Sequence, residues 1–202
     1  NNLIHQNDQH GITVGGNPDG SHAVHLINNT IALNSGDGLA IGEGSTPSGA
    51  AFLRNNIVYD NGQRNIDVTL ASSTAGYDGN YNLVYPMVRD DIVIGYGPGT
   101  FLGTFDVISP PAFVSSDTHT HHYSPAFYLA QALAGDGIDS PARDAGDPAT
   151  TSQYFTAARQ RTTATNHMPD TDTIDLGFHY PLSPTLLPSP EAQPSATAGG
   201  SF

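Results

Sequence analysis

The sequence contains no cysteine, no tryptophan and no lysine; its six basic residues are all Arg, and 17 of its 19 acidic residues are Asp. Without cysteine there is neither a disulfide framework nor a thiolate metal site. Lys and Glu are the residues that commonly fill exposed helix faces, so their scarcity predicts a protein with little helix. Asp, together with the abundant Asn and Gly, is typical of turns instead.

The charges are strongly unbalanced, with a net charge of -13 at pH 7. Such a chain repels phosphate backbones and anionic lipids, which excludes nucleic acid and membrane surfaces as expected partners. It has no apolar run of membrane-spanning length, so we expect no membrane span. The chain opens on Asn1 and Asn2 with no basic and apolar leader, and we therefore expect either a removed signal or a missing upstream region.

An internal repeat of 27 residues organises the first part of the chain. A double asparagine begins each repeat at residues 1–2, 28–29 and 55–56, and a fourth start at Asn82 follows Asn56 by 26 residues. Several columns keep the same phase, which indicates one structural unit per repeat. These columns are Asn7, Asn34 and Asn61; Gly11, Gly38 and Asn65; Ile12, Leu39 and Ile66; and Val14, Ile41 and Val68.

Each repeat holds three short apolar stretches that alternate with period two and are separated by Asn, Asp and Gly. This pattern predicts three short strands joined by corners. One repeat cannot bury its own apolar face, whereas coils stacked about 4.8 Å apart enclose a continuous core. We therefore predict an all-β, right-handed parallel β-helix with three strands per coil, in which Ile12, Leu39 and Ile66 stack inside. Asn7, Asn34 and Asn61 should form a hydrogen-bonded column at a corner.

The phrases NNTIALNSGDGLAIGEG (residues 28–44) and RNNIVYDNGQRNIDV (residues 54–68) resemble bacterial parallel β-helix repeat proteins of the pectate-lyase-like superfamily. The segments SPARDAGDP (140–148) and PDTDTIDLGFHYP (169–181) are similar to those that follow the last coils in such proteins. The resemblance implies a secreted or cell-surface protein. It leaves the activity open, because this superfamily holds lyases, hydrolases, epimerases, adhesins and surface proteins without known chemistry.

Beyond the fourth repeat start the period fades. We expect regular coils over residues 1–86, irregular closing coils and a C-terminal motif region over 87–182, and a Pro/Ser/Thr-rich tail or linker over 183–202. A short helix is predicted at Ser152 to Arg161, with Ser152 as its cap.

Catalysis is not expected, although four residues would serve it if it occurs. The stretch SGDGLAIGEGS (35–45) is similar to the polygalacturonase segment with two adjacent catalytic Asp, but Gly38 replaces the second, and QHGITVGG (9–16) is similar to its His-bearing segment. A lyase or epimerase would need a base and cationic groups beside its substrate. The candidates are Asp37, Arg54, Arg64 and His10; the alternative is that they belong to corners and a solvated face.

Two clusters have residue types that bind metals. Asp170, Asp172 and Asp175 form a D-x-D-x-x-D run that Asp144 and Asp147 would join if the two terminal motifs pack together, and such oxygen ligands suit Ca²⁺. The alternative is turn capping by Asp, and no other cofactor is expected. His119, His121 and His122 have the ligand type for a transition metal, against the alternative of an exposed loop.

Tyrosines gather near the last regular coils, and Tyr77, Tyr81 and Tyr85, with Tyr96 nearby, are candidates for stacking on sugar rings or for covering the core where the aliphatic columns end. The sequon at Asn28 is expected to have no role.

Asn1 is already in register with the repeat, so the first coil should expose unpaired backbone and a slice of core. We expect an upstream β-helix region or another copy of the protein to cover it, and head-to-tail stacking without closure would give a filament. The sequence therefore favours a non-catalytic, extracellular structural or adhesive β-helix that self-associates. The alternative is a fragment of a carbohydrate-active enzyme (polysaccharide lyase or glycoside hydrolase) or its sugar-binding module, with polysaccharide as a partner.

Overall fold

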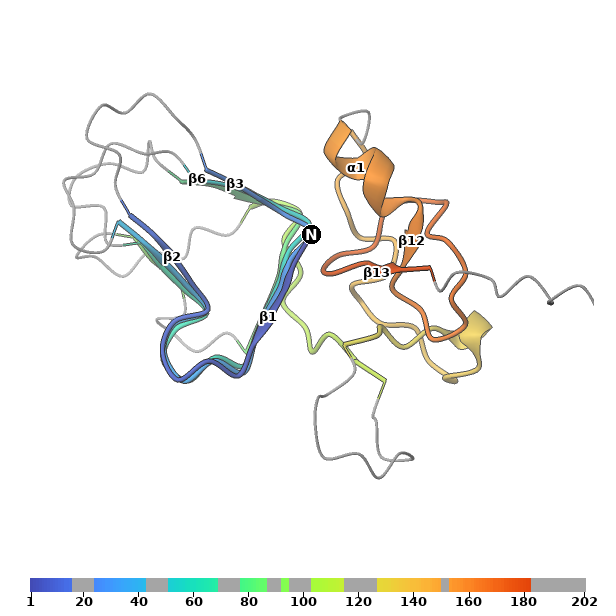
Figure 1. The fold of residues 1–202 in the computed structure, drawn as a ribbon, viewed down its shortest axis with the longest axis horizontal. Helices are drawn as coiled ribbons and strands as arrows, with labels where there is room; N and C mark the ends of the chain where they lie inside the picture. Colours follow the sequence, from blue (N-terminus) through green and yellow to red (C-terminus); the bar gives the residue numbers. More distant parts are fainter. Residues whose placement is uncertain are drawn as a thin grey trace, which may run out of the picture.

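The computed structural model describes residues 1–15, 24–42, 51–68, 77–86, 92–94, 103–114, 127–149 and 153–182. Short parallel strands stack in three sheets and form the predicted β-helix with three strands per coil (Figure 1). Sheet A contains β1 (Leu3–His5), β4 (Thr30–Ala32), β7 (Ile57–Tyr59) and β10 (Leu83–Tyr85). Sheet B contains β2 (Ile12–Val14), β5 (Leu39–Ile41), β8 (Ile66–Val68) and β11 (Ile92–Ile94). Sheet C contains β3 (Val24–Ile27), β6 (Ala51–Arg54) and β9 (Tyr77–Asn80).

The register of the strands follows the sequence repeat. Ile12 pairs with Leu39 and Leu39 with Ile66, so the predicted column is confirmed. The fourth repeat start keeps its 26-residue step, because Leu83 pairs with Ile57. In Figure 1 the chain runs clockwise from β1 through β2 to β3 with the first coil nearest the viewer, and this makes the coil right-handed.

The interior of the β-helix is an aliphatic core, supplied by alternate residues of all three sheets. It consists of Ile31, Leu39, Ile41, Ala51, Leu53, Val58, Ile66, Val68 and Val84, with partly buried residues of the first coil packed against it. Because side chains alternate across each strand, the intervening residues point outward.

The corners combine left-handed backbone with asparagine columns. Positive φ angles recur one coil apart at Gln6, Leu33 and Asp60 and at Asn28, Asn55 and Tyr81. Beside the first set, the Nδ2 atoms of Asn7 and Asn34 each donate to the Oδ1 of the next asparagine in the column, at 2.8 and 2.9 Å. The predicted corner column is therefore confirmed. A second column of the same kind contains Asn2, Asn29, Asn56 and Asn82.

Residues 127–149 and 153–182 form a lobe beside sheet A (Figure 1). It contains the 3₁₀-helix η2 (Ala132–Ala134), the helix α1 (Gln153–Ala158) and the antiparallel pair β12 (Arg161–Thr162) and β13 (Tyr180–Pro181). The predicted helix is present but ends at Ala158, because the chain turns there and enters β12 at Arg161.

The lobe covers the outer face of sheet A with a second apolar layer. Ile57 and Leu83 of the sheet pack against Leu129, Ala142 and Leu176 of the lobe. Gly177 lies close against the sheet with a φ of 88°, where a Cβ atom would come within 2.7 Å of Ile57 and of Thr30. Strand β4 and most of β7 and β10 are therefore buried on both faces.

Over the part of the chain described, no helix has the length and apolar character needed to cross a membrane.

Candidate functional site

Three of the four catalytic candidates stack directly over one another at the corner between sheets A and B. The Asp37 N–H donates to His10 Nδ1 at 3.0 Å, and Asp37 Oδ1 accepts the backbone N–H of Arg64 at 2.9 Å. A ring nitrogen that accepts an N–H carries no proton, so the 3.3 Å contact between His10 Nδ1 and Asp37 Oδ2 is not an ion pair in this arrangement. Asp37, only 4% exposed, therefore holds the backbone of the next coil.

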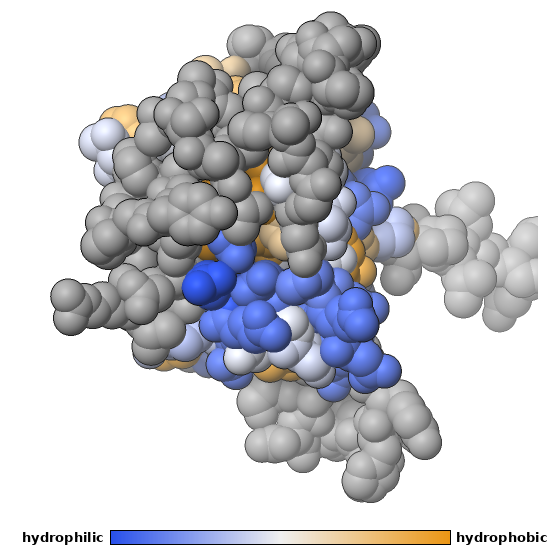
Figure 2. All heavy atoms as spheres, turned by 90° about the vertical axis from the view of Figure 1, so that its left-hand side faces the viewer, coloured by the Kyte–Doolittle hydropathy of each residue, from blue (hydrophilic) through white to orange (hydrophobic). Residues whose placement is uncertain are grey.

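This corner is hydrophilic on its outer side. Exposed polar residues recur there in successive coils, among them Asp8, Ser35 and Gln63. Figure 2 shows a hydrophilic area low on this face, at the height of the corner between β1 and β2 in Figure 1. Arg64 binds Asp67 Oδ2 at 2.8 Å, an ion pair within its own coil.

Arg54, the fourth candidate, lies at the other end of the coil, where sheet C leads into sheet A. Its guanidinium lies 4.0 Å from the Phe52 ring centroid, binds Asp78 Oδ1 at 2.8 Å and approaches Asp147 Oδ2 of the lobe at 3.8 Å. The structure thus brings His10, Asp37 and Arg64 together but not Arg54, and all four take part in contacts within the protein.

The tyrosine candidates pack against rings of the same chain. Tyr81 stacks on Phe105 with centroids 4.8 Å apart, and Tyr85 lies parallel to Tyr59 at 6.5 Å. Tyr77 belongs to β9, but its side chain lies outside the described part, as do Tyr96 and the cluster His119, His121 and His122. Sugar stacking by these residues stays a prediction.

Asn28 of the sequon is 1% exposed, with no hydrogen-bond partner for either side-chain polar atom among the described residues. Attachment of a glycan to Asn28 would require this corner to open.

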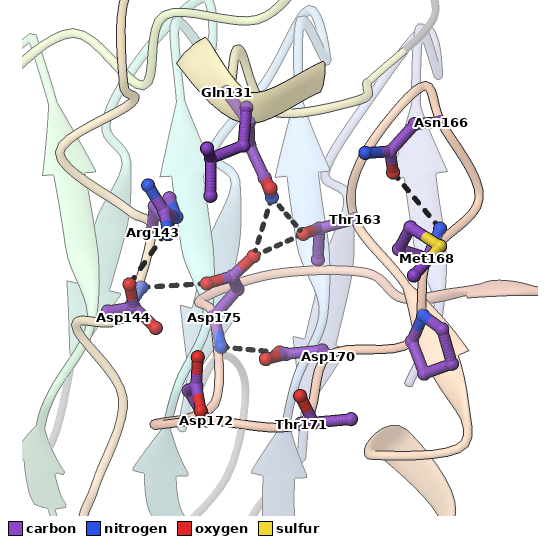
Figure 3. A pocket seen from close by; sticks show the side chains of 12 residues that line it. Gln131, Arg143, Asp144, Thr163, Asn166, Met168, Asp170, Thr171, Asp172 and Asp175 are labelled. Atoms are coloured by element: carbon purple, nitrogen blue, oxygen red, sulfur yellow. Dashed lines mark hydrogen bonds and ion pairs between the residues drawn. The ribbon is translucent and has the colours of Figure 1, made fainter.

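The lobe contains a pocket of about 320 Å³ that gathers most of the acidic candidates (Figure 3). Asp144 comes from the turn after Ser140, and the other three come from the D-x-D-x-x-D run that precedes β13. Asp144, Asp170, Asp172 and Asp175 all line this cavity. The two terminal motifs therefore pack together, which was the condition for Asp144 to join the D-x-D-x-x-D run.

Asp175 is the buried centre of this group. Its Oδ1 accepts the Asp144 N–H at 2.7 Å, and its Oδ2 accepts hydrogen bonds from the Thr163 hydroxyl and from Gln131 Nε2. Burial and the neighbouring Asp170 raise the pKa of Asp175 to about 6. Burial also raises the pKa of Asp144, with Arg143 beside it acting in the opposite direction.

Asp170 links the pocket to a fully buried histidine, His179. Asp170 Oδ2 accepts the Asp175 N–H at 2.7 Å and lies 2.9 Å from His179 Nε2. The other ring nitrogen of His179 lies 2.9 Å from the Gly177 carbonyl, and both nitrogens thus face acceptors. His179 is therefore held between the Asp170 carboxylate and the Gly177 carbonyl.

The fifth acidic candidate, Asp147, lies away from the pocket. Its N–H donates to Asn55 Oδ1 at 2.9 Å, and its carboxylate caps the Ala149 N–H at 2.9 Å. Among the residues with described positions, no three His, Asp or Glu side chains converge as metal ligands do. Calcium binding by the acidic candidates stays a prediction.

The sequence motifs did not identify the remaining lining of the pocket. Arg143 lies inside the SPARDAGDP segment, which the sequence singles out. Gln131, Thr163 and Met168 lie in irregular chain without a period, so no sequence signal connects them. Comparison with family models, with curated proteins and with solved structures finds no significant match to this chain.

Proposed function

We propose that the protein is a non-catalytic, extracellular structural or adhesive β-helix of the pectate-lyase-like kind, whose first coil accepts a further β-helix coil. The observation that carries this proposal is the polarity of the asparagine columns. In each pair, an asparagine donates from its backbone N–H and its Nδ2 to the Oδ1 of the asparagine in the following coil. Every coil therefore receives donors on one side and offers them on the other.

The acceptors are open at the first coil. Strands β1, β2 and β3 each lie at the edge of their sheet. No described residue donates to the Oδ1 atom of Asn2 or of Asn7, although the same atoms in later coils accept two hydrogen bonds each. A coil with asparagine donors at both corners is the partner that matches this edge.

The column that begins at Asn2 is closed at its opposite end, Asn82. The Asn82 N–H donates to Asp106 Oδ1 at 2.7 Å, and Asp106 Oδ2 accepts the Gly103 N–H. A carboxylate offers no donor to continue the column. A second copy stacked head to tail would place Asp106 against the open acceptor of Asn2, which favours a separate donor coil over a filament of identical copies.

A catalytic role has weaker support. The carboxylate of Asp37 holds the Arg64 backbone and that of Asp78 holds Arg54, whereas a lyase or hydrolase needs such groups directed at its substrate.

The test is to place a copy of residues 28–54 directly before Asn1, so that the copies of Asn29 and Asn34 lie over Asn2 and Asn7. We expect hydrogen exchange at β1 to slow by about tenfold or more, because edge amides become paired and covered. The matched control has both asparagines of the added coil changed to Asp, which removes the Nδ2 donors; we expect it to protect β1 less. Equal exchange with and without the added coil, or filaments of the unmodified chain, would contradict the proposal.

A further inference from the structure

The lobe pocket has features that the structural role does not use. It is concave, it encloses about 320 Å³, and it is lined by both acidic and apolar side chains. That volume is at the lower end of the range for small-ligand pockets and fits a single extended side chain or a small molecule. All of its lining residues belong to the lobe.

The carboxylates of the pocket are incompletely paired. Asp170 has a side chain only 7% exposed, yet only its Oδ2 atom has partners among the described residues. The carboxylate of Asp172 has no hydrogen bond or ion pair within the described part. Arg143, the one basic residue of the lining, is already bound to Asp139 at 2.8 Å and lies 3.3 Å from Asp144. The cavity is therefore short of positive charge.

Mutual repulsion among these groups adds to the larger effect of burial in raising the pKa values of Asp144 and Asp175. Asp170 and Asp172 both contribute to the raised pKa of Asp144, and Asp170 contributes to that of Asp175. A cation in the cavity would relieve this repulsion.

The rim of the pocket is apolar and exposed. Leu133 is 83% exposed and Met168 is 64% exposed, and both line the cavity with Pro169. In Figure 3, Met168 lies on the opposite side of the cavity from Arg143 and Asp144. Large apolar side chains exposed beside a charged pocket suit a ligand with an alkyl stem and a charged end.

A bare metal ion fits this arrangement less well than an organic cation. Calcium requires six or more oxygens around one point, whereas the described side chains offer no group of three that converges. An ammonium group carries three donors that can reach separate carboxylates.

We propose that this pocket binds an alkylammonium group, with the ammonium between Asp144, Asp170 and Asp172 and the alkyl stem against Leu133 and Met168. These 202 residues contain no lysine, so the ammonium group comes from outside them. A lysine side chain of a polypeptide and a free alkylamine share this chemistry.

The test uses the full chain and follows amide NMR shifts during titration with Nα-acetyl-lysine N-methylamide. We expect saturable binding with a dissociation constant on the order of 1 mM, as befits one charged side chain. The norleucine analogue, which lacks the ammonium, should not saturate. Pentylammonium that binds as tightly as the lysine derivative would identify a free amine as the ligand, and weaker binding would identify a polypeptide.

Two variants test whether the carboxylates of the pocket bind the ammonium group. Asp172→Asn should weaken binding about fivefold, because it removes one charge-assisted hydrogen bond at an exposed position. Asp8→Asn, which removes the same charge from an exposed corner of the β-helix, should leave binding unchanged. Equal binding of the norleucine analogue, an unaffected Asp172→Asn variant, absence of binding, or calcium binding that displaces the amine would each overturn the proposal.

Discussion

Asn29 Oδ1 accepts two hydrogen bonds from Asn2, one from the backbone N–H at 2.9 Å and one from Nδ2 at 2.8 Å. The same pair of hydrogen bonds recurs one coil later, between Asn29 and Asn56, where both residues are buried. The columns therefore satisfy backbone and side-chain groups at corners that strand pairing does not reach.

Removal of an interior residue of this column should destabilise the protein strongly. Asn56→Ala leaves the Asn29 N–H and Nδ2 without an acceptor and removes the donor to the Leu26 carbonyl. We expect the free energy of unfolding to fall by about 2–4 kcal/mol, since each buried unpaired group costs about 1–3 kcal/mol. Urea denaturation measures this. Asn2→Ala, at the exposed end of the same column, should cost less than about 1 kcal/mol; equal losses would show that the column contributes little.

The close packing of the lobe against sheet A should depend on Gly177. A Cβ atom at this position would come within 2.7 Å of Ile57 and Thr30, and its φ of 88° disfavours any L side chain. We expect Gly177→Ala to destabilise the protein by about 2 kcal/mol or more and to expose Ile57. Gly137→Ala is the matched control, because Gly137 also has a positive φ, of 78°, but faces open space. Similar thermal midpoints for the two variants would contradict the close packing.

Arg54 should fasten sheet C to the lobe. It contacts the Phe52 ring, Asp78 and Asp147 while its side chain is only 12% exposed. Arg54→Gln should lower the free energy of unfolding by about 1–3 kcal/mol and speed hydrogen exchange in the lobe near Asp147. Arg64→Gln, which loses one partly exposed ion pair, should change stability by about 0.5 kcal/mol or less. Unchanged exchange in Arg54→Gln would mean that the lobe is held without it.

Stability should respond to pH through Asp175. Its pKa of about 6 in the folded protein is above the ordinary value of 3.8 for Asp, so between these values the folded state binds more protons than the unfolded state. The contribution of Asp175 to the free energy of unfolding therefore falls by roughly 1–3 kcal/mol as pH rises from about 4 to about 6.

The measurement compares unfolding of the wild type and Asp175→Asn across that pH window. The difference in stability, wild type minus variant, should decrease as pH rises. A difference independent of pH would show that Asp175 does not titrate as inferred.

The β-helix was predictable because the same pattern of residues recurs in each coil. The column of Ile12, Leu39 and Ile66 carries the same signal in three coils, and the strand register follows from its constant spacing. The stacking of His10, Asp37 and Arg64 in one column was also predictable. Their hydrogen bonds were not, because the geometry of the corner decides whether the Asp37 carboxylate faces solvent or the backbone of the next coil.

The lobe lacks such redundancy. Its segments have no period, so its position on sheet A could not be derived from the sequence. The burial of Ile57 and Leu83 on the outward side of their strands was hidden for the same reason. Only the recurrence of acidic motifs hinted that Asp144 and Asp175 meet.

One short segment of the lobe touches three successive coils. The backbone of His179 exchanges hydrogen bonds with Asn1, Phe178 N–H donates to Thr30, and Gly177 N–H donates to the Asn55 carbonyl. Repeat proteins commonly fray one unit at a time from an end, since each unit touches only its neighbours. A segment bound to three coils opposes such stepwise unfolding. The coils that it contacts should therefore unfold together in a single cooperative transition.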